Sequence, residues 1–348
     1  MMFAILRHYG IPQQIVDAIK CLYDDSQSCV RNNGELSEFF EVMQGVFQGG
    51  TLAPYLFDIT LDYPMKKAEN NYGFITHHKL SSRKPEIKLP NLDFADDVAL
   101  LDESLDRAQK HLESVVDECK KIGLEINLKK TKYSTYNINN EKHLHLDSIP
   151  IEKTDNFKYL GSMTRSSTDD INRRRALAFS TFHKMNNIWN NNDIPLDLKV
   201  KIFRVSVLTI FLYGCETWII TEMDADCINS FATICYRKIL HIDQVLEHVT
   251  NQEVLRRVKT QELIFHVQKR QLEKTGHRLR KREGSFANRY AIYEPSHGHR
   301  TPGRPRKTYR EQIAMIINAN NKPSETEIRD YAQDRANWKK IIKDRTGI

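Results

Sequence analysis

The stretch Asn91-Leu92-Asp93-Phe94-Ala95-Asp96-Asp97-Val98-Ala99-Leu100-Leu101 places two adjacent carboxylates between two apolar runs. The flanking residues favour a short strand on each side, with a bend at Ala95-Asp96-Asp97. A tight hairpin would place Asp96 at its tip and Asp97 beside it. Paired carboxylate oxygens on a rigid turn suit Mg²⁺, which usually takes one or two carboxylates plus substrate phosphates. On this stretch alone a solvated surface turn is the simpler interpretation, because Asp is common in turns; the rest of the chain favours half of a two-metal site.

The composition is that of a soluble globular protein. With 348 residues, 40% hydrophobic and 28% charged, the chain is long enough for two or three domains. Its longest apolar run, Val205–Tyr213, is about half of the roughly 20 residues that span a bilayer, and Met1–Arg7 is too short for a secretion signal. The six cysteines are scattered, with no Cys-x-x-Cys pair, which argues against a zinc ribbon or a disulfide framework. We therefore expect a nuclear or cytoplasmic protein with no membrane partner.

The net charge of +7 is unevenly distributed. Residues 251–348 hold 23 Lys and Arg against 11 Asp and Glu, a balance of +12, whereas residues 1–250 carry a balance of −5. A localised basic excess indicates a polyanionic partner, usually nucleic acid. An ordinary solvated basic helix is the alternative.

Sequence patterns divide the chain into three regions. In residues 1–165 we expect helices entered at Pro12, at Leu52 and at Ser104, with Gly123 ending the last of them. The strand candidates in this region are Ser28–Arg31, Phe39–Val42, Leu124–Leu128, Lys132–Ile138 and Phe157–Gly161. These elements predict a small α+β sheet with helices on one face, and Pro64 is expected to end or kink the helix that begins near Leu52.

Beyond Gly161 the pattern becomes helical. Helices are expected at about 169–190, 196–214 and 222–240, the first with a capping box at Ser167 and Asp170. Residues 166–250 would form one helical region. Residues 251–348 would form a basic region, with a helix or helix pair at 250–283, a Pro- and Gly-rich linker at 295–305 and a last helical segment.

A glycine-rich turn, Gly45-Val46-Phe47-Gln48-Gly49-Gly50, precedes a helical run. Glycines let a backbone approach a ligand closely, and a helix N-terminus favours phosphate. Alone this is weak, because many turns into helices look similar.

The ordered set of motifs resembles the reverse transcriptase of non-LTR (LINE-type) retrotransposons. The set comprises Gly45–Gly49 with Leu52-Ala53-Pro54, then Phe94–Asp97, then Gly123-Leu124 with Asn127 and Lys130-Thr131-Lys132, then Tyr159-Leu160-Gly161. Leu212–Trp218, His277 and Gly303-Arg304-Pro305 are also typical of these elements. The resemblance implies an α+β fold: an incomplete right-hand polymerase palm, an α-helical thumb and a basic, mostly helical C-terminal region.

The same resemblance implies an RNA-directed DNA polymerase with an RNA template, a DNA primer and deoxynucleoside triphosphates as partners. Asp96 and Asp97 would bind catalytic Mg²⁺, with two ions in a complete site. Gly45, Gln48, Gly49, Lys130 and Lys132 would contact template or nucleotide. The residues Tyr159, Leu160 and Gly161 would form the primer grip. For Gln48 a simple helix-entry role is the alternative, and for the lysines simple solvation.

Several departures from the family pattern bear on activity. Phe47, Gly50 and Ala53 stand where the family usually has Arg, Cys and Ser. The family's first catalytic aspartate precedes the segment that matches Phe3–Leu6, so we expect an N-terminally truncated chain that polymerises weakly or not at all. A catalytically dead nucleic-acid-binding remnant, or a translated remnant with no selected role, are the alternatives. Oligomeric state is not indicated by the sequence.

Basic residues late in the chain are the candidates for nucleic-acid contacts. They are Arg278, Arg280, Lys281, Arg282, Arg304, Arg306 and Lys307. Thr301–Lys307 resembles the Gly-Arg-Pro core of a minor-groove AT-hook without its preceding Arg, with a basic linker as the alternative. His277, His297 and His299 have no cysteine near them and are interpreted as nucleic-acid contacts or surface residues.

Overall fold

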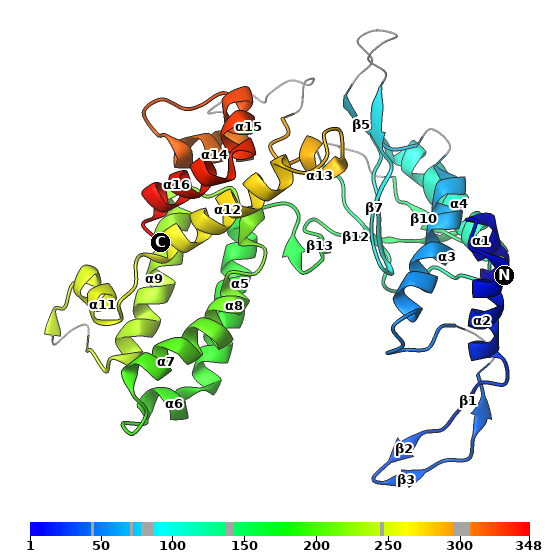
Figure 1. The fold of residues 1–348 in the computed structure, drawn as a ribbon, viewed down its shortest axis with the longest axis horizontal. Helices are drawn as coiled ribbons and strands as arrows, with labels where there is room; N and C mark the ends of the chain where they lie inside the picture. Colours follow the sequence, from blue (N-terminus) through cyan, green and yellow to red (C-terminus); the bar gives the residue numbers. More distant parts are fainter. Residues whose placement is uncertain (43–44, 70–71, 78–85, 137–141, 244–246, 295–306) are drawn as a thin grey trace. The chain divides into compact units, whose positions relative to one another are not determined.

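The computed structural model describes residues 1–42, 45–69, 72–77, 86–136, 142–243, 247–294 and 307–348. They form two compact units, Met1–Asp155 and Asn156–Ile348, here named the N-terminal unit and the helical unit. The first combines helices and strands, and the second is built almost entirely of helices (Figure 1). This mixture agrees with the predicted α+β class. None of the helices in the described ranges is both long and apolar enough to cross a membrane.

The N-terminal unit begins with two helices packed on a third. Helices α1 (Met2–His8) and α2 (Gln13–Tyr23) share an apolar cluster with α3 (Ala53–Ala68). The buried members of this cluster are Leu6, Val16, Ile19 and Leu56. Pro12 is the N-cap of α2. Our sequence prediction that the helix is entered at Pro12, with this residue in its first turn, is therefore displaced by one position.

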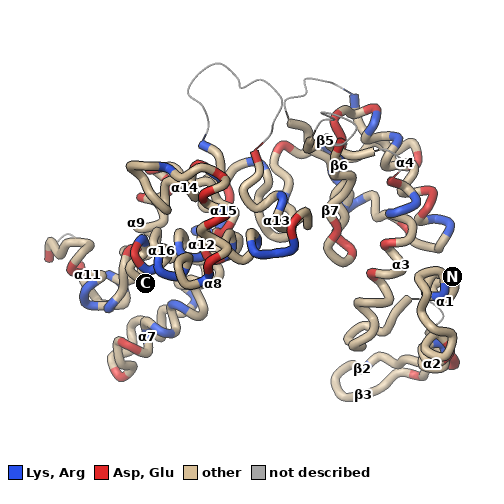
Figure 2. Tube along the Cα trace, turned by 45° about the horizontal axis from the view of Figure 1, so that its top comes forward, with Lys and Arg blue, Asp and Glu red and all other residues tan. Residues whose placement is uncertain are grey.

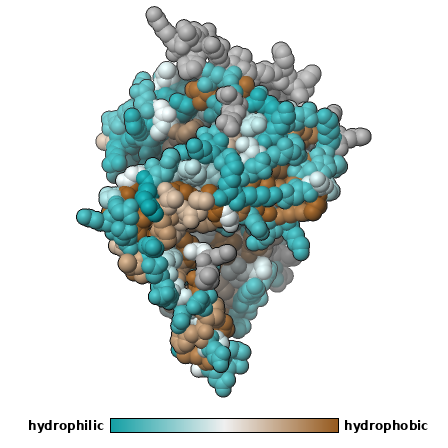
Figure 3. Space-filling model, turned by 90° about the vertical axis from the view of Figure 1, so that its right-hand side faces the viewer, coloured by the Kyte–Doolittle hydropathy of each residue, from teal (hydrophilic) through white to brown (hydrophobic). Residues whose placement is uncertain are grey.

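A narrow ribbon follows α2. In it β1 (Gln27–Ser28) pairs with β4 (Phe40–Glu41), and β2 (Arg31–Asn32) pairs with β3 (Glu35–Leu36). The turn between β2 and β3 holds Asn33 and Gly34 at positive φ. The ribbon forms the lower end of the N-terminal unit, where both apolar and hydrophilic residues reach the surface (Figure 3).

Helix α3 continues through Pro64, so the expectation that this residue ends the helix is wrong, while the alternative of a kink stays a prediction. Proline removes one helical hydrogen bond, yet the residues that follow it are held by tertiary contacts. Met65 and Ala68 are buried against Val115 and Cys119 of α4 (Leu105–Lys121). The burial of this apolar face offsets the local cost of the proline. Helix α4 itself begins at the predicted cap, because the Ser104 side chain accepts a hydrogen bond from the Arg107 amide.

The described strands of the N-terminal unit form two-stranded ladders, so the single small sheet predicted from the sequence is wrong. The ladders beyond the ribbon are β5 (Phe74–His77) with β6 (Ile87–Leu89), β7 (Asn91–Phe94) with β8 (Asp97–Leu100), β9 (Lys132–Tyr133) with β12 (Glu152–Lys153), and β10 (His145–Leu146) with β11 (Ile149–Pro150). Leu124–Leu128 is not a strand. Every second side chain of this segment faces the interior as the pattern predicts, because Leu124, Ile126 and Leu128 pack against buried clusters. The segment nevertheless pairs with no strand among the described residues.

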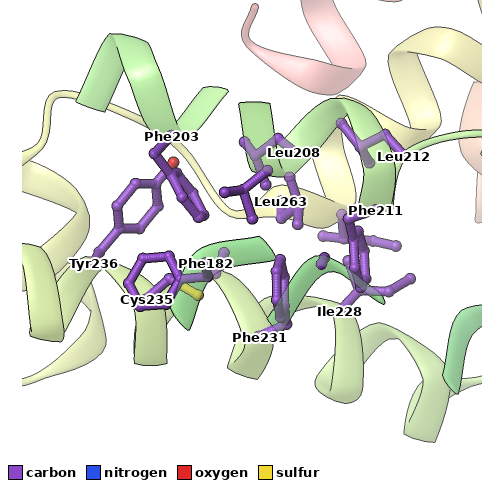
Figure 4. Close-up of a cluster of buried hydrophobic side chains, with 14 of the residues drawn as sticks. Phe182, Phe203, Leu208, Phe211, Leu212, Ile228, Phe231, Cys235, Tyr236 and Leu263 are labelled. Atoms are coloured by element: carbon purple, nitrogen blue, oxygen red, sulfur yellow. The ribbon is translucent and has the colours of Figure 1, made fainter. Parts of the chain in front are cut away.

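The helical unit starts with a short hairpin, β13 (Lys158–Tyr159) and β14 (Ser162–Met163). The helices and turns that follow are α5 (Ser167–Lys184), α6 (Asn186–Asn190), α7 (Leu196–Phe203), η1 (Arg204–Leu208), α8 (Thr209–Phe211), η2 (Cys215–Thr217) and α9 (Glu222–Ile239). Their aromatic side chains form the core shown in Figure 4. Phe211 and Phe231 stack at 4.4 Å between ring centroids, and Phe203 meets Tyr236 edge-on at 5.0 Å. The helix predicted at 222–240 is confirmed by α9. The one predicted at 169–190 is divided into α5 and α6, and the one predicted at 196–214 contains the π turn η1 and ends at Phe211.

The N-cap of α5 is Ser166, whose side chain accepts from the Asp169 amide at 3.2 Å. The capping box predicted at Ser167 and Asp170 is therefore wrong. Asp170 is drawn into the core instead, because its Oδ2 accepts a hydrogen bond from the indole Nε1 of Trp218 at 2.9 Å.

A second apolar cluster joins the C-terminal helices. These are α12 (Leu263–Leu279), α14 (Tyr309–Ile317), α15 (Glu325–Gln333) and α16 (Arg335–Thr346). Helix α11 (Asn251–Arg257) packs in the first cluster instead, and α13 (Phe286–Arg289) follows α12 in the chain. Trp338 of α16 lies against α12, and its Nε1 donates to the Leu272 carbonyl at 2.9 Å. A Cβ on Gly276 would lie 2.2 Å from that Nε1, so glycine is required for the contact. The predicted pair of helices within 250–283 is confirmed.

Candidate active site and nucleic-acid contacts

The β7–β8 hairpin places the two candidate catalytic carboxylates where the sequence predicted. Phe94 pairs with Asp97, which leaves Ala95 and Asp96 as the two-residue turn. Ala95 has a φ of 51°, an uncommon value for a residue with a Cβ. Both Asp96 and Asp97 are exposed. A strained turn that presents two carboxylates to solvent is suited to hold a cation or a polar ligand.

The two faces of the hairpin differ. Val98 and Leu100 pack toward the cluster of α3 and α4, whereas Leu92 and Phe94 point to the other side and are 44% and 64% exposed. Residues of one face alternate with those of the other along a strand. The hairpin is therefore supported by helices on one face and accessible on the other.

Asp93 lies on the supported face with Val98, its cross-strand partner. Partial burial of the carboxyl raises its pKa to about 6, and the nearby carboxylates of Glu69 and Asp62 add to the rise. Like charges that approach each other disfavour the ionised form. This group was not identified from the sequence, because Glu69 and Asp62 belong to α3 and its end, more than twenty residues earlier.

The base of the hairpin is held by a buried carboxylate. Asp102 is the second residue after β8, and its Oδ2 lies 2.7 Å from Nδ1 of His111 on α4. Its Oδ1 accepts a hydrogen bond from the Gly73 amide at 3.0 Å. Sequence patterns do not reveal this contact, since neither residue stands in a recognisable motif.

The carboxylates fit a divalent cation only as part of a ligand set. Asp96 and Asp97 supply the hard oxygens that Mg²⁺ prefers, and one or two carboxylates with substrate phosphates are a common set for this ion. Within the residues that the structure describes, no group of three or more His, Cys, Asp or Glu side chains is arranged to hold a metal.

The glycine-rich turn leads into α3 as predicted. Gly45 and Gly49 have positive φ values of 91° and 88°, where glycine is favoured. Phe47 stacks on Tyr23 of α2 at 4.4 Å, with the rings nearly parallel, so this residue anchors the turn to the helices. Gln48 is exposed and is left available for a ligand.

The two candidate lysines near Asn127 have different surroundings. Lys132 pairs with Glu152 across β9 and β12, at 2.7 Å between Nζ and Oε1. Lys130 is exposed, in a turn that the Asn127 side chain and carbonyl stabilise. The geometry favours Lys130 over Lys132 as a contact for an anionic ligand.

The Tyr159–Gly161 turn belongs to the helical unit rather than to the N-terminal unit. Its hairpin contacts α5, and the Gly161 carbonyl accepts hydrogen bonds from Arg173 and Arg174 of that helix. We expected residues up to 165 to close the palm. The division into palm, thumb and C-terminal regions stays a prediction, but the compact units separate at residue 155.

The basic candidates of the C-terminal region are of two kinds. Lys281 and Arg282 are exposed after α12, at the end of the run of basic residues visible on that helix in Figure 2. Arg280 instead donates to the Ala332 carbonyl at 2.7 Å, and Lys307 donates to the Ile220 carbonyl at 3.3 Å. Burial lowers the pKa of both groups.

The remaining candidates of the tail complete its description. Arg278 is partly buried on α12 and His277 is exposed. Arg304 and Arg306 lie outside the described residues, as do His297, His299 and all but the last residue of the AT-hook-like segment.

Comparison with known proteins identifies relatives for both parts of the chain. The family described as reverse transcriptase (RNA-dependent DNA polymerase) matches residues 3–164. A putative uncharacterized transposon-derived protein of Caenorhabditis elegans is 26% identical over 272 residues, which cover 74% of this chain and 96% of that protein. The retrovirus-related Pol polyprotein from a type-2 retrotransposable element of Drosophila melanogaster is 27% identical over 169 residues, which cover 45% of this chain and 15% of that polyprotein.

Proposed function

We propose that this chain is an RNA-directed DNA polymerase fragment of a LINE-type retrotransposon, whose reverse transcriptase domain is matched at residues 3–164, and that its β7–β8 hairpin is part of the polymerase catalytic site. The observation that carries this proposal is the pair of exposed carboxylates, Asp96 and Asp97, at a two-residue turn within the segment that matches the family. The substrates would be an RNA template, a DNA primer and deoxynucleoside triphosphates.

Asp96 and Asp97 would hold divalent metal, for which members of this family have a general requirement. Magnesium ions bound in such a site lower the charge cost when a primer 3′-hydroxyl attacks the α-phosphate of a nucleotide and pyrophosphate leaves. The chain itself contributes the carboxylate oxygens and their fixed spacing. Val98 and Leu100, packed toward α3 and α4, keep the hairpin in place while the turn stays accessible.

Other residues of the chain would bind the nucleic acid and the nucleotide. Gln48, in the turn between Gly45 and Gly49, would contact the template or the incoming base, since a glycine backbone permits close approach. Lys130 would approach the phosphates of the nucleotide, because its ammonium is exposed and the neighbouring Lys132 is paired with Glu152. Tyr159, Leu160 and Gly161 would contact the primer.

A second candidate function is nucleic-acid binding without synthesis. It is favoured by the arrangement of the possible ligands: among the described residues, no three or more His, Cys, Asp or Glu side chains are grouped so that they could hold a metal ion. Two-metal sites place their ions about 3.5–4 Å apart and need several ligands. Under this alternative the exposed basic residues Lys281 and Arg282 would still bind phosphates.

Primer extension separates the two functions. We would compare the chain, its Asp96→Asn variant and a version extended upstream in its own reading frame, each on an RNA template with a labelled DNA primer and Mg²⁺. Asp106→Asn, an exposed carboxylate at the start of α4, is the matched control. Binding of the primer–template would be measured on the same samples.

Synthesis that is abolished by Asp96→Asn and kept by Asp106→Asn is the expected result for the polymerase, in either version of the chain. If no version synthesises DNA while all of them bind the primer–template, the catalytic proposal is wrong and the binding function remains.

A further inference from the structure

The Leu160–Gly161 turn is held through its backbone carbonyls. Leu160 and Gly161 both have positive φ, at 47° and 83°. The hydroxyl of Tyr213 donates to the Leu160 carbonyl at 3.0 Å. The Gly161 carbonyl accepts from Arg173 at 2.9 Å and also from Arg174. Two consecutive peptide groups are thus fixed by side chains that lie 12 to 53 positions away in the sequence.

Two of the three side chains that hold this turn, Arg174 and Tyr213, also contact each other, and we call this pair the clamp. The Arg174 guanidinium lies over the Tyr213 ring, 4.3 Å from its centroid. A cation over an aromatic face is attractive, and more so when it is removed from water; Arg174 is only 7% exposed. The position of either side chain therefore depends on the other.

The buried carboxylate of Asp170 forms an ion pair with Arg174 on the same helix. Asp170 lies one helical turn earlier on α5, with its Oδ1 3.9 Å from the Arg174 Nε. Asp170 is itself held by the Trp218 indole at 2.9 Å and by the Met163 amide at 3.2 Å. Since Met163 belongs to β14, this carboxylate also connects the hairpin to the core.

The clamp requires close packing around the turn. A Cβ on Gly161 would lie 3.3 Å from both the Arg174 guanidinium and the Tyr213 ring. A Cβ on Gly214, which follows Tyr213, would lie 2.5 Å from the Ser162 hydroxyl. Both glycines also have positive φ. A side chain at Gly161 or at Gly214 would therefore separate the turn from the segment that carries Tyr213.

The turn nevertheless remains accessible. Leu160 is 38% exposed, and a hollow of about 380 Å³ opens beside it, lined by Tyr213 and Arg270 among others. A turn of fixed backbone with an open side can contact a ligand without losing much conformational entropy on binding.

We propose that Arg174 and Tyr213 are positioning residues that hold the Leu160–Gly161 turn in the conformation that contacts the primer strand. The proposal rests on the proposed polymerase or nucleic-acid-binding function for the identity of the ligand. Neither side chain has to contact the primer, because each acts through a carbonyl of the turn. The residues of the clamp all belong to the helical unit.

The test uses two conservative variants and one matched control in the full chain. Tyr213→Phe removes the hydroxyl but keeps the ring beneath Arg174. Arg174→Lys keeps the charge but loses the planar guanidinium that donates to Gly161. The control is Arg175→Lys, since Arg175 is exposed on the same helix and donates to the Cys227 sulfur instead. Tyr213 is 51% exposed, so its variant is expected to fold even if Arg174→Lys is destabilised.

Two measurements distinguish the rigidity of the turn from its contact with the primer. Hydrogen exchange of residues 158–163, without nucleic acid, should become about two- to tenfold faster in both variants, the range that corresponds to one lost hydrogen bond. Crosslinking from a 4-thiothymidine at the primer 3′ end to residues 158–163 should decrease in the same variants. Arg175→Lys should change neither.

If the hydrogen exchange rate of residues 158–163 is unchanged in both variants, the claim that Arg174 and Tyr213 hold this turn is wrong, whatever the chain binds. Faster exchange with crosslinking equal to that of the unmodified chain would overturn the positioning role. If the unmodified chain gives no crosslink at this turn although it binds the primer–template, the assignment of the turn to the primer is wrong. If it binds no primer–template at all, the proposed function fails together with that assignment, and only the clamp measured by exchange stands.

Discussion

The Nδ1 of His111 lies 2.7 Å from Oδ2 of Asp102, and the exposed fractions of the two side chains are 0% and 1%. Tyr72 stacks on the imidazole at 4.9 Å between ring centroids, and the Gly73 amide donates to the other carboxylate oxygen. The pair thereby joins α4, the end of β8 and the entrance to β5. It fixes the base of the hairpin whose tip carries Asp96.

Replacement of His111 by Leu should destabilise the N-terminal unit by about 3 kcal/mol, because the substitution leaves a buried carboxylate without its main partner. The three tryptophans, Trp189, Trp218 and Trp338, all belong to the helical unit. Urea unfolding followed by circular dichroism should therefore show an earlier transition while the tryptophan fluorescence midpoint stays in place. Lys110→Ala, exposed on the same helix, is the control; a fluorescence midpoint that shifts equally would contradict this assignment to one unit.

The raised pKa of Asp93 predicts a specific dependence of stability on pH. Partial burial and the neighbouring Glu69 and Asp62 raise this pKa from an ordinary value near 3.8 to about 6. Between these values the folded state binds more protons than the unfolded state, so stability falls as pH rises through the window and stays lower above it. Because Asp93 is partly exposed, solvent screening reduces the size of this effect.

Asp93→Asn should remove the loss of folding stability that accompanies ionisation of Asp93. The variant should then be more stable than the unmodified chain at pH 7 and equally stable near pH 4. Unfolding midpoints from pH 4 to pH 8 would measure the difference, with Asp58→Asn on the exposed side of α3 as the control. A variant whose midpoint runs parallel to that of the unmodified chain across this range would argue against the raised pKa.

The basic residues after α12 should contribute to nucleic-acid affinity in a salt-dependent way. Each phosphate contact adds about 0.9 to the slope of log affinity against log salt concentration, so the double variant Lys281→Gln/Arg282→Gln should lower that slope by about 2. Lys307→Gln should leave the slope nearly unchanged, because its ammonium donates to the Ile220 carbonyl. Binding of a labelled duplex at several salt concentrations measures both, and equal changes in the two variants would refute the distinction.

A buried amide pair should stabilise the helical unit. Gln271 donates to the Cys215 and Trp218 carbonyls at 3.0 and 2.9 Å, and Gln312 donates to Gln271 at 2.9 Å. Gln271→Leu should lower the free energy of unfolding by about 2–4 kcal/mol, because buried carbonyls lose their donor.

Tryptophan fluorescence in urea would measure this loss, since Trp218 lies beside the pair. Gln268→Leu on the same helix introduces the same side chain outside this hydrogen-bond network and should cost much less. Similar losses in the two variants would mean that the apolar substitution itself, rather than the amide pair, is responsible.

The elements predicted correctly from the sequence depend on neighbours within a few residues. The hairpin tip at Asp96, the Ser104 cap and the helices from Ser167 to Ile239 are of this kind. Errors arose where distant packing outweighed a local preference. Pro64 stays within α3 because the following turn is buried against α4, and Asp170 leaves its expected cap because the Trp218 indole binds it.

The sequence by itself determined the resemblance to reverse transcriptases, the position of the paired carboxylates and the turn at Leu160–Gly161, because an ordered set of short motifs specifies each of them locally. Only the tertiary structure decided what supports these sites. Asp102 contacts His111, Lys132 pairs with Glu152, and Tyr213 donates to the Leu160 carbonyl, across separations of 9 to 53 residues. Such pairs depend on how whole helices and strands pack, and the burial that selects them is a property of the folded chain rather than of any window of sequence.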